Sequence, residues 1–116
     1  MKPRLLAAGL AMSFLALFAL AFAAETSRGA PTHRYVVERT FPKGALDGLD
    51  AAQKKKVNQT NARFGVRWVM SYATPDRTKT YCIYVAPDAI AIRSAAQANG
   101  LPVDSITEVP VTLEAE

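Results

Sequence analysis

The sequence predicts an α+β domain in which four strands form an antiparallel sheet and two helices cover one of its faces. Three observations lead to this fold class. Four short runs after residue 32 are rich in β-branched and aromatic residues, which is typical of strands. Two stretches between these runs repeat apolar residues at helical spacing. Turn residues and helix-end signals separate the six elements, so the connections between them are short.

The first two elements are a strand and a helix. Residues 33–41 (HRYVVERTF) form the first predicted strand, and the PKG sequence that follows ends it. The helix is expected over residues 46–64. Asp47 and Asp50 favour its positive N-terminal end, and Gly65 stands where a C-terminal glycine belongs.

A hairpin follows this helix. Residues 66–72 (VRWVMSY) and 78–85 (TKTYCIYV) are predicted strands. The segment between them contains TPDR at residues 74–77, whose proline and aspartate are typical turn residues. The short connection makes the two strands antiparallel neighbours.

The last two elements complete the order βαββαβ. Asp88 can cap a second helix, which Gly100 and Pro102 bring to an end. Residues 105–113 form the last predicted strand, and Pro110 within it favours an edge position. This element order is that of the split βαβ, or ferredoxin-like, fold.

The N-terminus has the three-part pattern of a secretory signal peptide. A short basic region precedes an almost wholly apolar run, and Ala21-Phe22-Ala23 supplies a cleavage site. We therefore expect a signal peptide at residues 1–23, a polar linker at 24–32 and the folded domain at 33–116. The protein is expected in the periplasm or outside the cell. The alternative is an uncleaved membrane anchor.

Composition argues against a nucleic-acid-binding function and against an internal disulfide. Removing Lys2 and Arg4 with the signal lowers the formal net charge from +4 to +2, and the basic run at residues 54–56 has no interleaved aromatic residues. A nucleic-acid-binding surface is therefore not expected. With Cys82 as the only cysteine, the domain has no internal disulfide.

Side chains alternate between the two faces of a sheet, which allows the faces to be predicted. In the third strand Tyr81, Ile83 and Val85 are the more apolar set, and we expect them to meet the helices. Cys82 and Tyr84 would then lie on the helix-free face. In the first strand Tyr35 and Val37 are expected inside, which leaves Val36 and Glu38 beside Cys82. For the second strand, either Trp68, Met70 and Tyr72 or the intervening residues could face the helices.

The helix-free face is expected to be rich in aromatic and sulfur-containing side chains, so a second copy of the chain should cover it and form a homodimer. Within the enclosed cleft, Glu38, Cys82, Tyr72 and Tyr84 are candidate ligands. Their donor atoms suit Ni²⁺, Zn²⁺ or Cu²⁺ better than Mg²⁺ or Ca²⁺. The alternatives are an ion pair of Glu38 with Arg39 or Arg67, and a buried Cys82 that only packs.

Several segments together resemble a small bacterial domain family with uncharacterised and nickel-binding members. They are RYVVERTFP, VRWVMSY, KTYCIYVAPD and ANGLPVDSITEV, and the likeness extends from about Tyr35 to Val109. The resemblance implies a ferredoxin-like dimer of the α/β-barrel kind, with nickel bound in some relatives. The positions that carry over as candidate site residues are Glu38, Tyr72, Cys82 and Tyr84.

Two other functions stay open at this point. One is a small-ligand-binding or assembly module without metal. The other is an enzyme like the small α/β-barrel monooxygenases, which rests on fold analogy alone. A catalytic pair of Cys82 and His33 is not expected, since His33 lies roughly 16 Å along an extended strand from Glu38.

Overall fold

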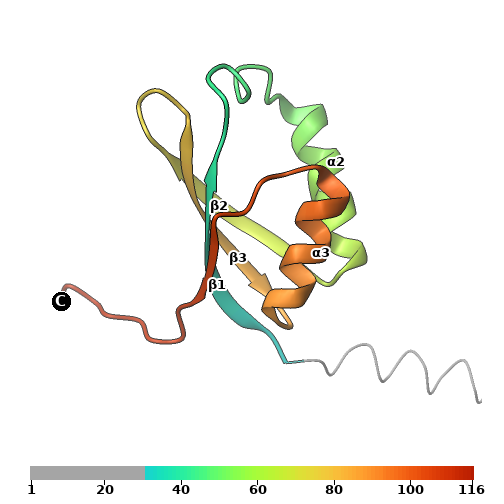
Figure 1. Cartoon of the computed structure of the whole chain (residues 1–116). Coiled ribbons are helices and arrows are strands. Elements are labelled where there is room, and N and C mark those ends of the chain that lie inside the picture. Colours follow the sequence, from blue (N-terminus) through green and yellow to red (C-terminus); the bar gives the residue numbers. More distant parts are fainter. Residues whose placement is uncertain (1–30) are drawn as a thin grey trace, which may run out of the picture. The chain divides into compact units, whose positions relative to one another are not determined.

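The computed structural model describes residues 31–116 (Figure 1). The predicted signal peptide at 1–23 and nearly all of the predicted linker at 24–32 lie outside these residues. The predicted element order is confirmed. In chain order the elements are β1 (His33–Thr40), α2 (Ala51–Arg63), β2 (Arg67–Ala73), β3 (Lys79–Ala86), α3 (Ala89–Asn99) and β4 (Ser105–Glu108).

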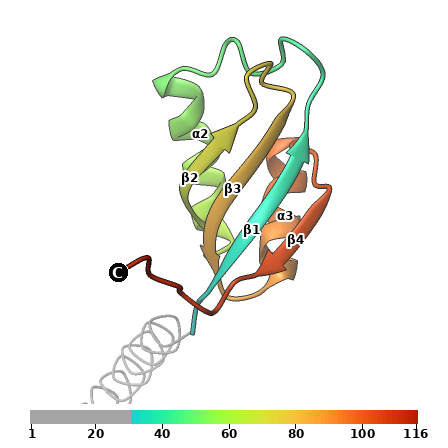
Figure 2. The same cartoon turned by 90° about the vertical axis from the view of Figure 1, so that its left-hand side faces the viewer.

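The four strands form one antiparallel sheet in the order β2-β3-β1-β4. Both helices lie on the same face of this sheet, and no element covers the other face within the described part of the chain (Figures 1 and 2). The structure thus has the predicted ferredoxin-like α+β fold. Strand β4 is at an edge, as Pro110 predicts. Within residues 31–116, neither helix has the length and apolar character needed to cross a membrane.

Helix α2 begins later than predicted. Residues 43–48 form turns, and the helix starts at Ala51. The reason is a local cap: Asp50 has an extended backbone, and its Oδ1 accepts a hydrogen bond from the Gln53 backbone N–H at 2.8 Å. The end is as predicted, since Gly65 follows the helix with a φ of +71°.

Strand β4 is shorter than the predicted strand at residues 105–113. The Val109 backbone N–H still donates to the Arg34 carbonyl at 2.9 Å, but regular pairing ends at Glu108. The next residue, Pro110, has no N–H with which to continue the ladder.

A bulge in β2 reverses the alternation of its side chains. Trp68 lies opposite Tyr84 and Met70 opposite Ile83, so Val69 is the extra residue of the bulge. Trp68 therefore faces the helices, whereas Met70 faces the open side. Strict alternation of side chains would place both on the same face, and the assumption of strict alternation is wrong for β2.

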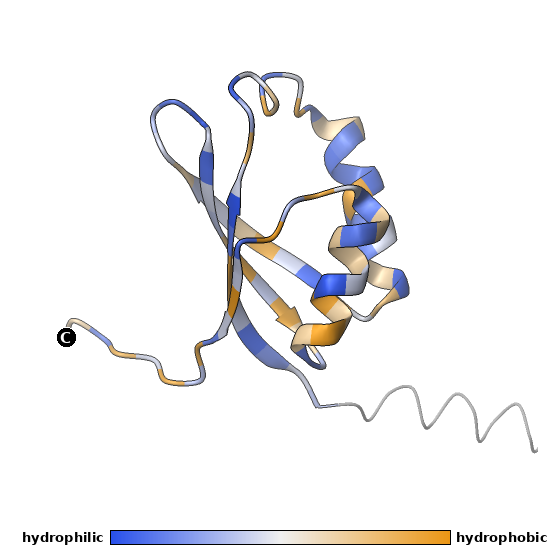
Figure 3. Cartoon of the chain, viewed as in Figure 1, coloured by the Kyte–Doolittle hydropathy of each residue, from blue (hydrophilic) through white to orange (hydrophobic). Residues whose placement is uncertain are grey.

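The hydrophobic core lies between the sheet and α3. That helix buries Ile92, Ala95 and Ala96, whereas the only buried residue of α2 is Asn61. Figure 3 shows the same contrast, because most of α2 is coloured hydrophilic. Helix α3 therefore supplies the buried apolar side chains that the two helices contribute to the core.

Gly100→Ala is expected to lower the free energy of unfolding by about 1 kcal/mol. Gly100 ends α3 with φ +68° and ψ +31°, a left-handed conformation that a Cβ atom disfavours. An added Cβ there would meet no atom within 4 Å, so the backbone conformation alone is responsible. Gly48→Ala is the matched control, because that site is equally open and its φ is not positive. Equal midpoints for the two variants in urea denaturation would contradict this prediction.

Candidate functional site

The structure divides the four predicted ligands between the two faces of the sheet. In the pairing of β1 with β3, Val37 lies opposite Cys82 and Glu38 opposite Tyr81. Directly opposed residues share a face. Cys82 and Tyr84 are buried in the core under the helices, at 4% and 3% exposure. Their predicted position on the helix-free face is wrong.

Glu38 and Tyr72 lie on the helix-free face. Glu38 is there because its neighbour Val37 is buried in the core, as predicted for the first strand. Tyr72 lies opposite Tyr81, which in turn lies opposite Glu38. The sheet itself separates these two residues from Cys82, so the four predicted ligands cannot form one coordination sphere.

The error in β3 has a physical cause. The prediction turned the more apolar of the two alternating sets of side chains toward the helices. In β3, however, both sets are largely apolar. The more apolar residues Ile83 and Val85 lie half-buried on the open side. The polar hydroxyl of Tyr84 is accommodated inside because the Arg39 guanidinium donates a hydrogen bond to it at 3.4 Å.

The helix-free face combines apolar, aromatic and polar side chains, and we call it the open face. Tyr72 is its most exposed large hydrophobic side chain, at 62%. Tyr81 and Met70 are also exposed, although each carries a large apolar surface. Cross-strand register defines the central members of the open face as Val36, Glu38, Met70, Tyr72, Lys79, Tyr81, Ile83, Ser105 and Thr107.

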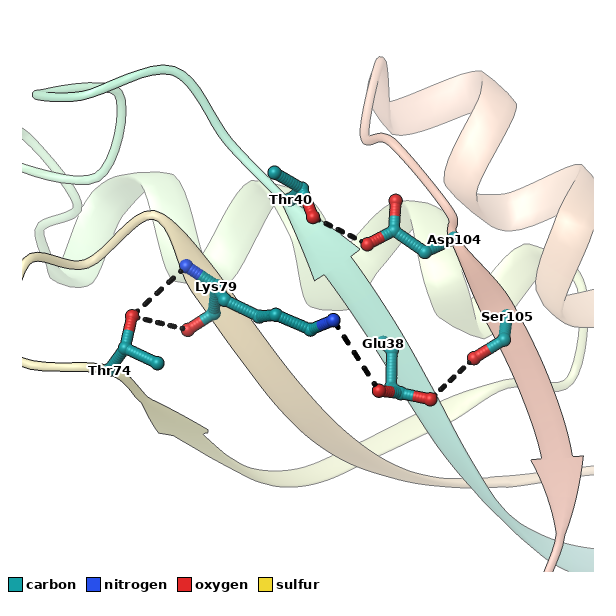
Figure 4. Close-up of polar contacts among 6 residues, drawn as sticks. All are labelled: Glu38, Thr40, Thr74, Lys79, Asp104 and Ser105. Atoms are coloured by element: carbon teal, nitrogen blue, oxygen red, sulfur yellow. Dashed lines mark hydrogen bonds and ion pairs between the residues drawn. The ribbon is translucent and has the colours of Figure 1, made fainter.

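Glu38 is held in place on the open face by residues from two neighbouring strands (Figure 4). The Ser105 hydroxyl donates a hydrogen bond to its Oε2 at 2.7 Å, and Lys79 Nζ lies 3.7 Å from its Oε1. The expected alternative partners are not used: Arg39 is buried on the other face, and the ion pair is formed with Lys79. Glu38 is thus a half-buried, oriented carboxylate.

A second pair of potential donors lies at the start of β1. His33 Nδ1 is 3.1 Å from Glu108 Oε1, and both side chains are nearly half exposed. Residues 31–116 contain no group of three or more histidine, cysteine, aspartate or glutamate side chains placed to hold a metal ion. One protomer therefore offers Glu38 and the His33–Glu108 pair as separate donors.

The thiol of Cys82 lies inside the domain. Its Sγ donates a hydrogen bond to Thr80 Oγ1 at 3.4 Å, and both residues are buried. Cys82 lies on the opposite side of the sheet from the open face and has apolar surroundings. Both features are typical of a cysteine that only packs in the core. Sequence alone left this alternative open.

Arg39 is the buried residue that sequence reasoning did not single out as a site residue. Its Nη1 donates to the Pro102 carbonyl at 2.6 Å, and its guanidinium carbon lies 5.7 Å from the centre of the Tyr84 ring. Burial raises the pKa of the Tyr84 phenol, although the Arg39 charge acts in the opposite direction. The neutral hydroxyl of Tyr84 is therefore the form present at neutral pH.

Comparisons with known proteins agree with the fold. A family model described as "Nickel responsive protein SCO4226-like" matches residues 35–109. The crystal structure of SCO4226 from Streptomyces coelicolor A3(2) superposes with a TM-score of 0.52 at 20% sequence identity, covering 69% of this chain and 99% of that one. At this identity the superposition shows a shared fold. No curated protein sequence matches.

Proposed function

Because the chain belongs to the SCO4226-like family of nickel responsive proteins, we propose that it is an exported, homodimeric protein that binds Ni²⁺ between two open faces. Export is supported by the signal-peptide pattern of residues 1–23. Homodimerisation is supported by the exposed apolar and aromatic side chains of the open face.

The observation that carries the proposal is the position of Glu38. Its carboxylate is half-buried among apolar and aromatic side chains, and its only ion-pair partner in the described residues is the partly exposed Lys79 at 3.7 Å. A second copy over this face would exclude water from the carboxylate and make its charge costly. A divalent cation would compensate that charge more strongly than one lysine.

The donor set fits an ion shared between two copies. Within residues 31–116, one protomer has too few donors for a closed site. In a two-fold dimer, each copy would present its own Glu38 toward the same cleft. Tyr72 and water would be further oxygen donors. These donors are all oxygen atoms, because the register places the His33–Glu108 pair on the helix-covered face. The choice of Ni²⁺ over Zn²⁺ or Cu²⁺ therefore follows from the family.

The chain without residues 1–23 and without a histidine tag is expected to bind Ni²⁺, and Glu38→Gln is expected to weaken this binding by at least about tenfold. Loss of an outer-sphere partner alone already costs roughly tenfold or more. Glutamine keeps the shape of the side chain and can still accept the Ser105 hydrogen bond, so the variant tests the charge. Isothermal titration calorimetry at fixed pH provides the dissociation constants.

Cys82→Ser is the matched control. Because its side chain is buried under the helices, this variant is expected to bind Ni²⁺ as the wild type does. Loss of binding in Cys82→Ser with retention in Glu38→Gln would refute the assignment of the site to the open face. A wild-type protein that binds no Ni²⁺ but still dimerises in a chelator would instead indicate an assembly module.

A further inference from the structure

A cavity of about 560 Å³ lies between α2 and the sheet, on the face opposite the proposed nickel site. Helix α2 contributes Lys54, Val57 and Asn58 to its wall, and the strands contribute residues that include Arg39 and Trp68. Helix α2 is mostly polar and buries only Asn61, so its own side chains leave this space unfilled. Its volume is within the range of small-molecule binding sites.

Arg39 in the wall of this cavity is a buried charge without a charged partner. Its exposure is 3%, and no carboxylate in residues 31–116 lies within ion-pair distance of its guanidinium. Its two hydrogen-bond acceptors, the Pro102 carbonyl and the Tyr84 hydroxyl, are both neutral. They satisfy part of its hydrogen-bonding capacity but leave its positive charge uncompensated, which is costly in a buried position.

The other polar groups of the cavity also favour an anion. Among the described residues, its lining includes two further cations, Lys54 and Arg77, and no aspartate or glutamate. The Tyr84 hydroxyl accepts a hydrogen bond from Arg39, and the Thr80 hydroxyl accepts one from Cys82. The protons of both hydroxyls remain available to a ligand, because no acceptor for them is present among the described residues. The lining therefore offers donors and positive charge.

The rest of the wall is apolar. Eight large apolar side chains line the cavity around Arg39. They come from the segment before α2, from α2, from β2 and from the loop before β4: Phe41, Leu46, Leu49, Val57, Trp68, Val69, Met70 and Leu101. A ligand that fills this space needs an apolar body. Because a single cation is deeply buried, the complementary ligand has one negative charge at one end.

We propose that this cavity binds a small organic monocarboxylate, with its carboxylate on the Arg39 guanidinium and its apolar body between α2 and the sheet. The planar fork of a guanidinium matches the two oxygens of a carboxylate. The Tyr84 hydroxyl donates a further hydrogen bond to the same group. Of the open-face residues only Met70 lines this cavity, and Met70 is not a proposed nickel donor, so the proposal does not depend on the nickel function.

The test compares octanoate with octanamide, which has the same apolar chain and no charge. Trp68 is the only tryptophan of the chain and lines the cavity, so its fluorescence reports on the site directly. Octanoate is expected to change this fluorescence and to bind at least about tenfold more tightly than octanamide, because hydrogen bonds between charged groups are stronger than those to a neutral amide. Similar affinities for the two compounds, or no response at millimolar octanoate, would overturn the proposal.

Two variants locate the contact. Arg39→Met keeps an unbranched side chain without the charge, and it is expected to weaken octanoate binding at least about tenfold while leaving octanamide unaffected. Replacing a buried charge with an apolar side chain is compatible with folding, which circular dichroism verifies. Should Arg39→Met not fold, Tyr84→Phe, which removes only one hydroxyl, provides the comparison. Full affinity in the folded variant would refute the assignment.

Glu38→Gln separates this proposal from the nickel site. It is expected to leave octanoate binding unchanged, since Glu38 lies on the opposite face. Loss of octanoate binding in Glu38→Gln would place the ligand on the open face and refute the cavity. If the wild-type protein binds no Ni²⁺, octanoate is still expected to bind in the cavity with the same affinity.

Discussion

Replacing Ile92 with alanine is expected to lower the free energy of unfolding by about 3 kcal/mol. Ile92 is 1% exposed and is one of the two largest fully buried side chains in the described part of the chain. It lies in α3, the helix that supplies the buried apolar side chains of the helical layer. Because α2 contributes little burial, other side chains are poorly placed to fill the space that a smaller residue leaves.

A loss of this size is a large fraction of the stability of a small domain, which is typically about 5–15 kcal/mol. Urea denaturation followed by circular dichroism measures it. Ile90→Ala is the matched control, because Ile90 is in the same helix and is 73% exposed. Its expected effect is within about 0.5 kcal/mol. Similar losses for both variants would mean that α3 does not bury the face that the structure assigns to it.

The second large effect concerns the proposed dimer. Ile83→Lys is expected to raise the dissociation constant of the homodimer at least about a hundredfold, because a lysine buried without a partner costs several kcal/mol. Ile83 lies in the central strand β3, on the open face. It is only half-buried in the protomer, so the lysine can reach water in the monomer, and the fold should persist.

Sedimentation analysis over a range of concentrations determines the dissociation constant. Ile90→Lys introduces the same charge on the exposed surface of α3 and is expected to leave the dimer intact. A wild-type protein that is monomeric at high micromolar concentration would contradict the proposed assembly. Equal weakening by both lysine variants would point to an interface that involves α3.

The nickel-associated family was recognisable from short segments of the sequence, and the family match over residues 35–109 confirms that resemblance. Site prediction succeeded less well. Glu38 was correctly expected on the helix-free face because Val37 beside it is a strong core residue. Cys82 and Tyr84 were misplaced because β3 is largely apolar on both faces, and hydrophobicity alone cannot choose between them.

The sequence by itself determined the order of the elements and most of their ends. Asp88, Gly100 and Pro110 act through their own backbone and its immediate neighbours, so their effects can be predicted without knowledge of the fold. Only the tertiary structure decided which face each strand turns toward the helices. That choice depends on contacts between distant residues, such as Arg39 with Tyr84, and a single bulge residue, Val69, reverses it.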